Sequence, residues 1–233
     1  MKTTLFVIIA LLLMLNVHSK EKKETGVTAS MQRTSFKIDN VVVNIPLPGP
    51  DYFCTSEALV KKNTWLVPKP DTLVTCYSSL GGVTYSKVKA AIGMKYEEIY
   101  AARESFVKVM KDDLKTDVTL DEFKKLSKEA TEDLQEVTLL AVDKLLYEDG
   151  KKQEVKSGLK VELGCFIMRD TAYGVVSIVP DSNGPLVICD VTILVRGRIM
   201  HLTTNCKFNE ASSVKFLMEL SRKWADATIK ANK

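Results

Sequence analysis

Residues 189–206, CDVTILVRGRIMHLTTNC, bring together several residue types that can do chemistry. The stretch holds Cys189, Cys206, Asp190 and His201, and His201 is the only histidine beyond the first nineteen residues. Cysteine and histidine side chains can hold a zinc ion, and an Asp–His pair can activate a nucleophile. Either chemistry depends on which side of the local structure each residue occupies.

A β-hairpin explains this stretch. A two-residue turn at Arg196-Gly197 sets Val195 opposite Arg198 and collects the apolar side chains on one face. With this register both cysteines face the core, whereas His201 and Asp190 lie on the opposite face. Residues on opposite faces of a sheet cannot share one zinc ion, whose bonds are about 2.0 to 2.3 Å long. The sequence therefore predicts a hairpin rather than a metal site.

The remaining motif search is negative. The chain has no G-x-G-x-x-G, P-loop, H-E-x-x-H or G-x-S-x-G pattern. No serine or cysteine in a recognisable elbow accompanies His201 and Asp190, and Thr192, directly opposite His201, is a poor nucleophile. We expect no enzyme, no cofactor and no metal, and we keep His201 and Asp190 as weak candidates for a surface site.

The N-terminus predicts export. After Lys2, residues 5–15 form an unbroken apolar run, and small residues follow in the pattern that signal peptidase reads. A helix of that length is about 16 Å long, too short for a hydrocarbon core of about 30 Å. We expect residues 1–19 to be a cleaved signal peptide, 20–35 a flexible leader and 36–233 a single domain. An uncleaved N-terminal anchor is the alternative.

Charge and cysteine content limit the partners. Without residues 1–19 the chain keeps 32 basic and 29 acidic residues, a net charge of +3. No basic face with stacking aromatics is visible, so we expect no nucleic-acid partner.

Export implies an oxidising compartment, where five cysteines leave at least one outside any internal pair. We favour a disulfide between Cys54 and Cys76, and Cys165 with one of the two late cysteines is a further option.

Two-residue alternation predicts strands at both ends of the chain. Residues 36–50 indicate a strand that prolines end, and residues 72–82 indicate another. Four strand-like segments joined by short turns follow later, which implies an antiparallel meander. These segments are 159–170, 173–179, 185–195 and 198–208. Asn209 is expected to cap a final helix.

The middle of the chain is expected to be helical. From Glu97 apolar residues recur at threes and fours, and Thr119 with Glu122 forms a capping box. The apolar stripe that follows contains Phe123, Leu126, Ala130, Leu134, Val137, Ala141 and Leu145, and Gly150 suits its end. The expected fold class is α+β: an antiparallel β-meander packed on helices, with a long central helix and a C-terminal helix.

Two stretches resemble a known family. VVVNIPLPGPDYF is similar to the opening strand of the PsbP-like family of exported or lumenal α+β proteins. The ending, from Arg196-Gly197 to WADATIKANK, is similar to the C-terminal half of that fold and to a group of uncharacterised exported proteobacterial proteins. The family consists largely of accessory and binding proteins, so the resemblance implies no catalytic residue.

These observations favour an exported, non-enzymatic accessory or binding protein that is periplasmic or secreted. We expect its partner to be a protein or small molecule in the envelope or outside the cell, with membrane contact only if the signal peptide stays uncleaved. Two alternatives remain open: a membrane-retained envelope protein with an N-terminal anchor, and an enzyme of unrecognised type.

Overall fold

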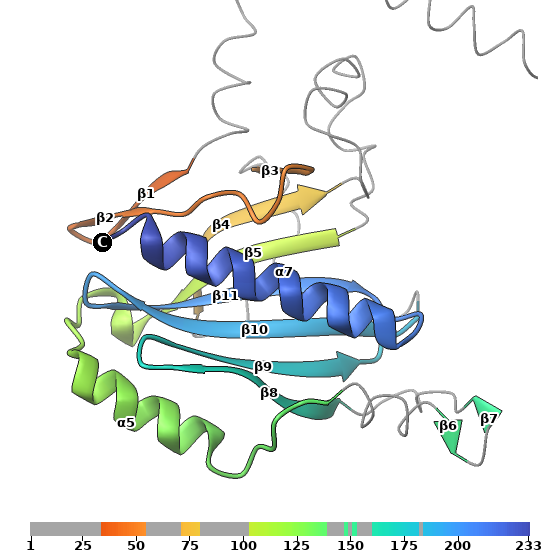
Figure 1. Ribbon diagram of the computed structural model, residues 1–233. Coiled ribbons are helices and arrows are strands. Elements are labelled where there is room, and N and C mark those ends of the chain that lie inside the picture. Colours follow the sequence, from red (N-terminus) through yellow and green to blue (C-terminus); the bar gives the residue numbers. More distant parts are fainter. Residues whose placement is uncertain are drawn as a thin grey trace, which may run out of the picture.

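A seven-stranded antiparallel sheet forms the body of the protein (Figure 1). The computed structural model describes residues 34–54, 71–79, 103–138, 147–148, 151–152, 160–181 and 184–233. The expected signal peptide at 1–19 and all of the leader but its last two residues lie outside the described residues. The strand order across the sheet is β3-β4-β5-β11-β10-β9-β8.

The elements have the following bounds. The large sheet contains β3 (Tyr52–Cys54), β4 (Asp71–Ser79), β5 (Arg103–Met110), β8 (Val161–Arg169), β9 (Ala172–Val179), β10 (Leu186–Val195) and β11 (Arg198–Lys207). Two smaller sheets pair β1 (Ser35–Ile38) with β2 (Val41–Asn44), and β6 (Tyr147–Glu148) with β7 (Lys151–Lys152). The helices are the 3-10 turn η4 (Asp112–Leu114), α5 (Leu120–Thr131) and α7 (Ala211–Lys230).

The hairpin of β10 and β11 has the predicted register. Val195 lies opposite Arg198, and Cys189 lies opposite Thr204. Both turn residues have a positive φ, 49° at Arg196 and 74° at Gly197, as a two-residue turn of type I′ requires. The four strands expected in the last third of the chain are confirmed with shifts of one or two residues at their ends.

The helix expected from Glu97 is wrong in its described part, because residues 103–110 form strand β5. The segment RESFVKVM fits both periods: Phe106, Val109 and Met110 are spaced for a helix, whereas Val107 and Val109 alternate as in a strand. β5 lies between β4 and β11, where Val107 and Val109 are fully buried. Backbone pairing of this segment with β4 on one side and β11 on the other favours the strand period over the helical one.

The long central helix is also wrong. The capping box at Thr119 and Glu122 is confirmed, but α5 ends at Thr131, and residues 147–148 are a strand. After α5 the chain runs along the edge strand β8, where the amide of Val137 donates to Cys165 O and the amide of Cys165 donates to Gln135 O. These bonds satisfy backbone groups that an edge strand leaves open. Residues 139–146 and Gly150 lie outside the described residues.

The fold-class prediction therefore needs correction. The described part of the chain is mostly β, with one large antiparallel sheet and two α-helices, α5 and α7, in place of a meander packed on a long central helix. The buried side of α5 also differs from the predicted stripe. It contains Phe123, Ser127 and Thr131, while Leu126 is 44% exposed.

The N-terminal segment is a hairpin rather than the predicted single strand. β1 and β2 pair across a turn in which Asp39 has φ 51°, a conformation that aspartate tolerates better than most residues. The C-terminus holds this hairpin. The Asn232 side chain accepts from the amide of Asn44 at 2.9 Å and donates to Asn44 O at 2.6 Å. Asn232 thus extends the hydrogen-bonding pattern of β2.

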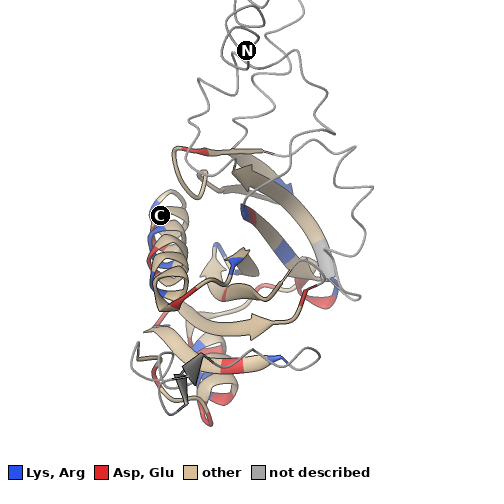
Figure 2. Cartoon of the chain, turned by 90° about the vertical axis from the view of Figure 1, so that its right-hand side faces the viewer, with Lys and Arg blue, Asp and Glu red and all other residues tan. Residues whose placement is uncertain are grey.

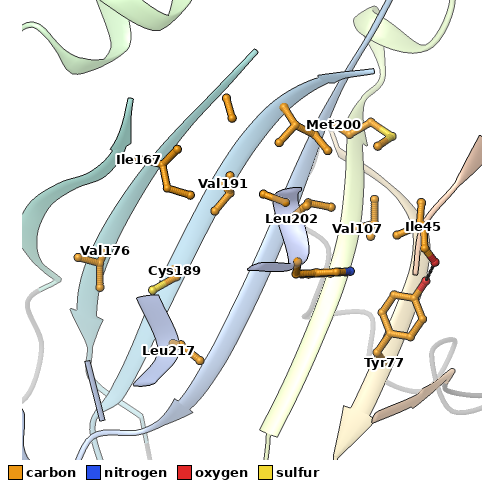
Figure 3. Close-up of a cluster of buried hydrophobic side chains, with 14 of the residues drawn as sticks. Ile45, Tyr77, Val107, Ile167, Val176, Cys189, Val191, Met200, Leu202 and Leu217 are labelled. Atoms are coloured by element: carbon orange, nitrogen blue, oxygen red, sulfur yellow. Dashed lines mark hydrogen bonds between the residues drawn. The ribbon is translucent and has the colours of Figure 1, made fainter. Parts of the chain in front are cut away.

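Helix α7 covers one face of the large sheet (Figure 1), and most of its buried residues belong to the hydrophobic core. Leu217 points from the helix toward the strands that carry Cys189 and Leu202 (Figure 3). Trp224 packs edge-on against Tyr77, and its indole donates to Pro46 O at 2.7 Å. The Tyr77 hydroxyl donates to Ile45 O at 3.1 Å. The buried side chains of Trp224 and Tyr77 therefore hold the backbone of residues 45 and 46, directly after β2.

Helix α5 lies on the other face of the sheet. Phe123 contacts the ring of Tyr173, which alternates with the core residue Ala172 along β9 and so points away from α7. Charged residues of both signs are spread over helices and strands (Figure 2). Among the described residues, no helix combines the length and the apolar character needed to cross a bilayer.

Gly164 and Gly184 give a stability prediction. Both have positive φ, 127° and 103°, but a Cβ at Gly164 would lie 2.2 Å from Gln135 O, whereas nothing lies within 4 Å of one at Gly184. Gly164→Ala should lower the free energy of unfolding by about 3 kcal/mol or more, and Gly184→Ala by about 1 to 2 kcal/mol, because only the first adds a clash to the backbone strain. Urea unfolding followed by tryptophan fluorescence measures both, and equal losses would contradict the close approach at Gly164.

Candidate functional site

The two residues predicted as weak site candidates lie on the sheet face opposite α7. His201 Nδ1 and Thr192 Oγ1 are 3.1 Å apart, and the Thr203 hydroxyl donates to Asp190 Oδ1 at 2.5 Å. His201 and Asp190 are half-buried, and both threonines are buried. Each candidate thus bonds to the threonine directly opposite it in the hairpin. This arrangement holds the two side chains in place on a polar sheet face.

Charged groups from neighbouring elements surround His201. Lys108 is its direct neighbour on β5, and its ammonium lies 5.6 Å from the centroid of the Phe106 ring. Burial raises the pKa of Asp113, which lies in η4, while the charge of His201 acts in the opposite sense. Within the described residues, no three cysteine, histidine or acidic side chains are placed to hold a metal ion. The face offers hydrogen bonds but no evident nucleophile.

All five cysteines are buried thiols in the structure. Cys54 lies opposite Tyr77 and faces α7, with its sulfur 3.3 Å from Thr75 Oγ1. Cys76, one residue before Tyr77, points to the other face and packs against Phe106. The sheet thus separates the two cysteines of the predicted disulfide, which is not formed here. Burial raises the pKa of Cys206 to about 11 and also raises that of Cys189 well above its ordinary value, which keeps both as unreactive thiols.

A second polar group, which the sequence did not reveal, lies on the α7 side of the sheet. The strand register sets Tyr52, Ser79, Arg103 and Cys206 side by side on β3, β4, β5 and β11, and we call these four residues the arginine row. Ser105 lies two residues along β5 from Arg103 and therefore faces the same side. The neighbouring positions on β10 and β9 are the apolar Val187 and Ile178.

Arg103 is held by contacts on two sides. Its Nη2 donates to Asp51 Oδ2 at 3.3 Å, and the same oxygen accepts the Ser79 hydroxyl at 2.6 Å. The guanidinium also lies over the ring of Phe216 on α7, 4.7 Å from its centroid. The side chains of Arg103 and Asp51 are 19% and 15% exposed, and Phe216 is 43% exposed. The arginine row therefore reaches solvent at Arg103.

Two hydroxyls near Arg103, those of Tyr52 and Ser105, are buried side by side. Tyr52 and Ser105 are fully buried, and within the described part of the chain each hydroxyl has no hydrogen-bond partner apart from the other one. Burial raises the pKa of Tyr52 to about 12, while Ser105 and Arg103 favour its ionised form. Two hydroxyls that bond only to each other leave one O–H donor without an acceptor, at a cost of about 1 to 3 kcal/mol, which makes this pair a candidate contact for a polar molecule.

Sequence reasoning missed the arginine row because its members come from four separate strands. Arg103 and Ser105 were assigned to a helix, and Ser79 lay at the end of an expected strand. The useful signal was the alternation of RESFVKVM, which puts Arg103 and Ser105 on the same face as Val107 and Val109. The partners of Arg103 across the sheet follow only from the strand order.

Comparisons with known proteins place the chain in no family. No family model matches it, and no curated protein matches it. Among solved structures it is similar to the Ran-binding protein Mog1p of Saccharomyces cerevisiae, with 12% identity and a TM-score of 0.36 over 87% of this chain and 95% of that chain. At this TM-score the likeness carries no inference about fold, partner or function.

Tyr52 and Tyr77 form a matched pair for testing the buried hydroxyls. Both side chains are fully buried on neighbouring strands, but only the Tyr77 hydroxyl donates to a backbone oxygen, that of Ile45. Tyr77→Phe should lower the free energy of unfolding by about 1 kcal/mol, whereas Tyr52→Phe should leave it unchanged or raise it. Urea unfolding measures both variants. A loss at Tyr52 as large as that at Tyr77 would show that its hydroxyl has a structural partner besides Ser105.

Alkaline pH gives a second test of Tyr52. Its pKa is about 12 in the folded chain against 10.0 as the ordinary value, so the unfolded chain loses the phenol proton first. The stability linked to Tyr52 is complete below pH 10 and is lost as the pH rises toward 12, by about 2 kcal/mol at pH 12. Urea unfolding between pH 9 and 11.5 should show a steeper loss for the natural chain than for Tyr52→Phe. Equal slopes would contradict the raised pKa.

Proposed function

We propose that this chain is an exported, non-enzymatic binding protein that holds a small polar ligand at the arginine row. The two buried hydroxyls of Tyr52 and Ser105 support the proposal most directly. A core that needs only stability is better served by phenylalanine and alanine at these positions, because apolar groups require no hydrogen bond. Polar groups retained there are explained by a bound partner that satisfies them.

The contacts of Arg103 support the same proposal. Ser79 and Asp51 fix one side of the guanidinium, and Phe216 supports its flat face. An arginine held in this way loses little conformational entropy when a ligand binds, which favours affinity. The apolar run at residues 5–15 supports export to the periplasm or out of the cell.

Native mass spectrometry tests the proposal. The natural chain, exported by its own signal and purified gently, should carry extra mass beyond residues 20–233. Arg103→Met should lose that mass, because the variant removes the charged donor at the entrance to the site. Arg169→Met is the matched control, since Arg169 also pairs with an aspartate, Asp226, but lies outside the row. It should keep the extra mass.

Two outcomes would count against this function. A natural chain without extra mass, in several preparations from its own organism, would contradict a carried ligand. Extra mass that survives Arg103→Met and is instead lost in His201→Ala would move the site to the opposite face of the sheet.

A further inference from the structure

We infer that the ligand of the arginine row carries a carboxylate group, an inference that rests on the proposed function. The groups that the described residues leave available at the site are a donor-only guanidinium and hydroxyls that can donate. Within the described residues Arg103 makes one hydrogen bond, to Asp51, and a guanidinium has five N–H donors. The Tyr52 phenol, with a pKa of about 12, keeps its proton near neutral pH and can donate it.

The carboxylate that the described residues bring to the site, that of Asp51, is already engaged. Asp51 Oδ2 accepts from both Ser79 and Arg103. A ligand that approaches Arg103 therefore meets a guanidinium, two neutral hydroxyls and the buried thiol of Cys206. Such a donor-rich set is complementary to a group that presents acceptor oxygens.

Charge and shape favour a carboxylate over a phosphate. The positive charge of Arg103 is the only cationic charge that the described residues bring to the row, and Asp51 lies within bonding distance of it. A dianionic phosphate would meet the negative charge of Asp51 with one cation to offset it. A carboxylate carries one charge and matches the planar fork of a guanidinium with two parallel hydrogen bonds.

The entrance to the site indicates what the carboxylate is attached to. Phe216 is 43% exposed and lies beside the guanidinium, so an apolar or aromatic body can pack on its ring. Two sources fit this chemistry: a small organic acid, and the C-terminal carboxylate of a peptide that ends in an apolar residue. Both present one carboxylate next to an apolar group.

Paired probes of equal shape test the inference. Benzoate and benzamide represent the small acid, and N-acetylphenylalanine and its amide represent a peptide C-terminus. Saturation-transfer and titration NMR on the full mature chain give Kd for each compound. The acid of at least one pair should bind at least tenfold more tightly than its amide, since a charge-assisted bidentate bond is worth more than a neutral one. The pair that shows the difference identifies the source.

Two variants tie the binding to the row. Tyr52→Phe should raise the Kd of the acid about fivefold to tenfold and that of the amide less, whereas Tyr77→Phe should change neither. Arg103→Met should abolish the preference for the acid. We expect Tyr52→Phe to fold, since it removes only a hydroxyl, so the test remains decisive even if Arg103→Met does not fold.

The outcomes separate this inference from the proposed function. Equal affinity for acid and amide, with both weakened by Tyr52→Phe, would overturn the carboxylate while leaving the binding function in place. No binding by any of the four compounds would also overturn the carboxylate inference, and the native mass spectrum would then decide separately whether a ligand is carried at all.

Discussion

The register of the antiparallel sheet is the constraint on which the rest of the structure depends. The tight turn at Arg196-Gly197 fixes which residues of β10 and β11 face α7, and β5, β4 and β3 are then added to β11 in a set pairing. Because side chains alternate along every strand, a slip of one residue would move each side chain to the other face. The same pairing places Cys189 and Leu202 under α7 and lines up the arginine row beside them.

The α7 side of the sheet changes in character along the strands. In one part Val107, Leu202 and Val191 lie side by side and pack as core (Figure 3). Toward the other end Ser79, Arg103 and Cys206 lie side by side on β4, β5 and β11, with Phe216 of α7 beside the guanidinium. Apolar packing holds the helix on the sheet, while the polar end carries the arginine row that we propose as a binding site. The opposite face is also polar, but His201 and Asp190 there are bonded to neighbouring threonines.

Local signals predicted the last third of the chain well. Four strands, the hairpin register and the capping box at Thr119 were readable because a short turn or a side-chain cap defines each within a few residues. The prediction of the central region was wrong for two physical reasons. The segment RESFVKVM fits both the helical and the strand period. The chain after α5 pairs with β8, a strand that lies about 30 residues further on. The arginine row needs four strands brought together by long-range pairing, so no local pattern contains it.

The central claim, that Tyr52 and Ser105 serve a ligand, is tested most directly by a high-resolution crystal structure of the protein purified from its own organism without added ligand. The account predicts density for a bound organic molecule that accepts hydrogen bonds from Arg103 and from at least one of the two hydroxyls. Density for ordered water alone, bonded to both hydroxyls, would contradict it, because water would then be the missing partner and the row would be a structural feature of the core.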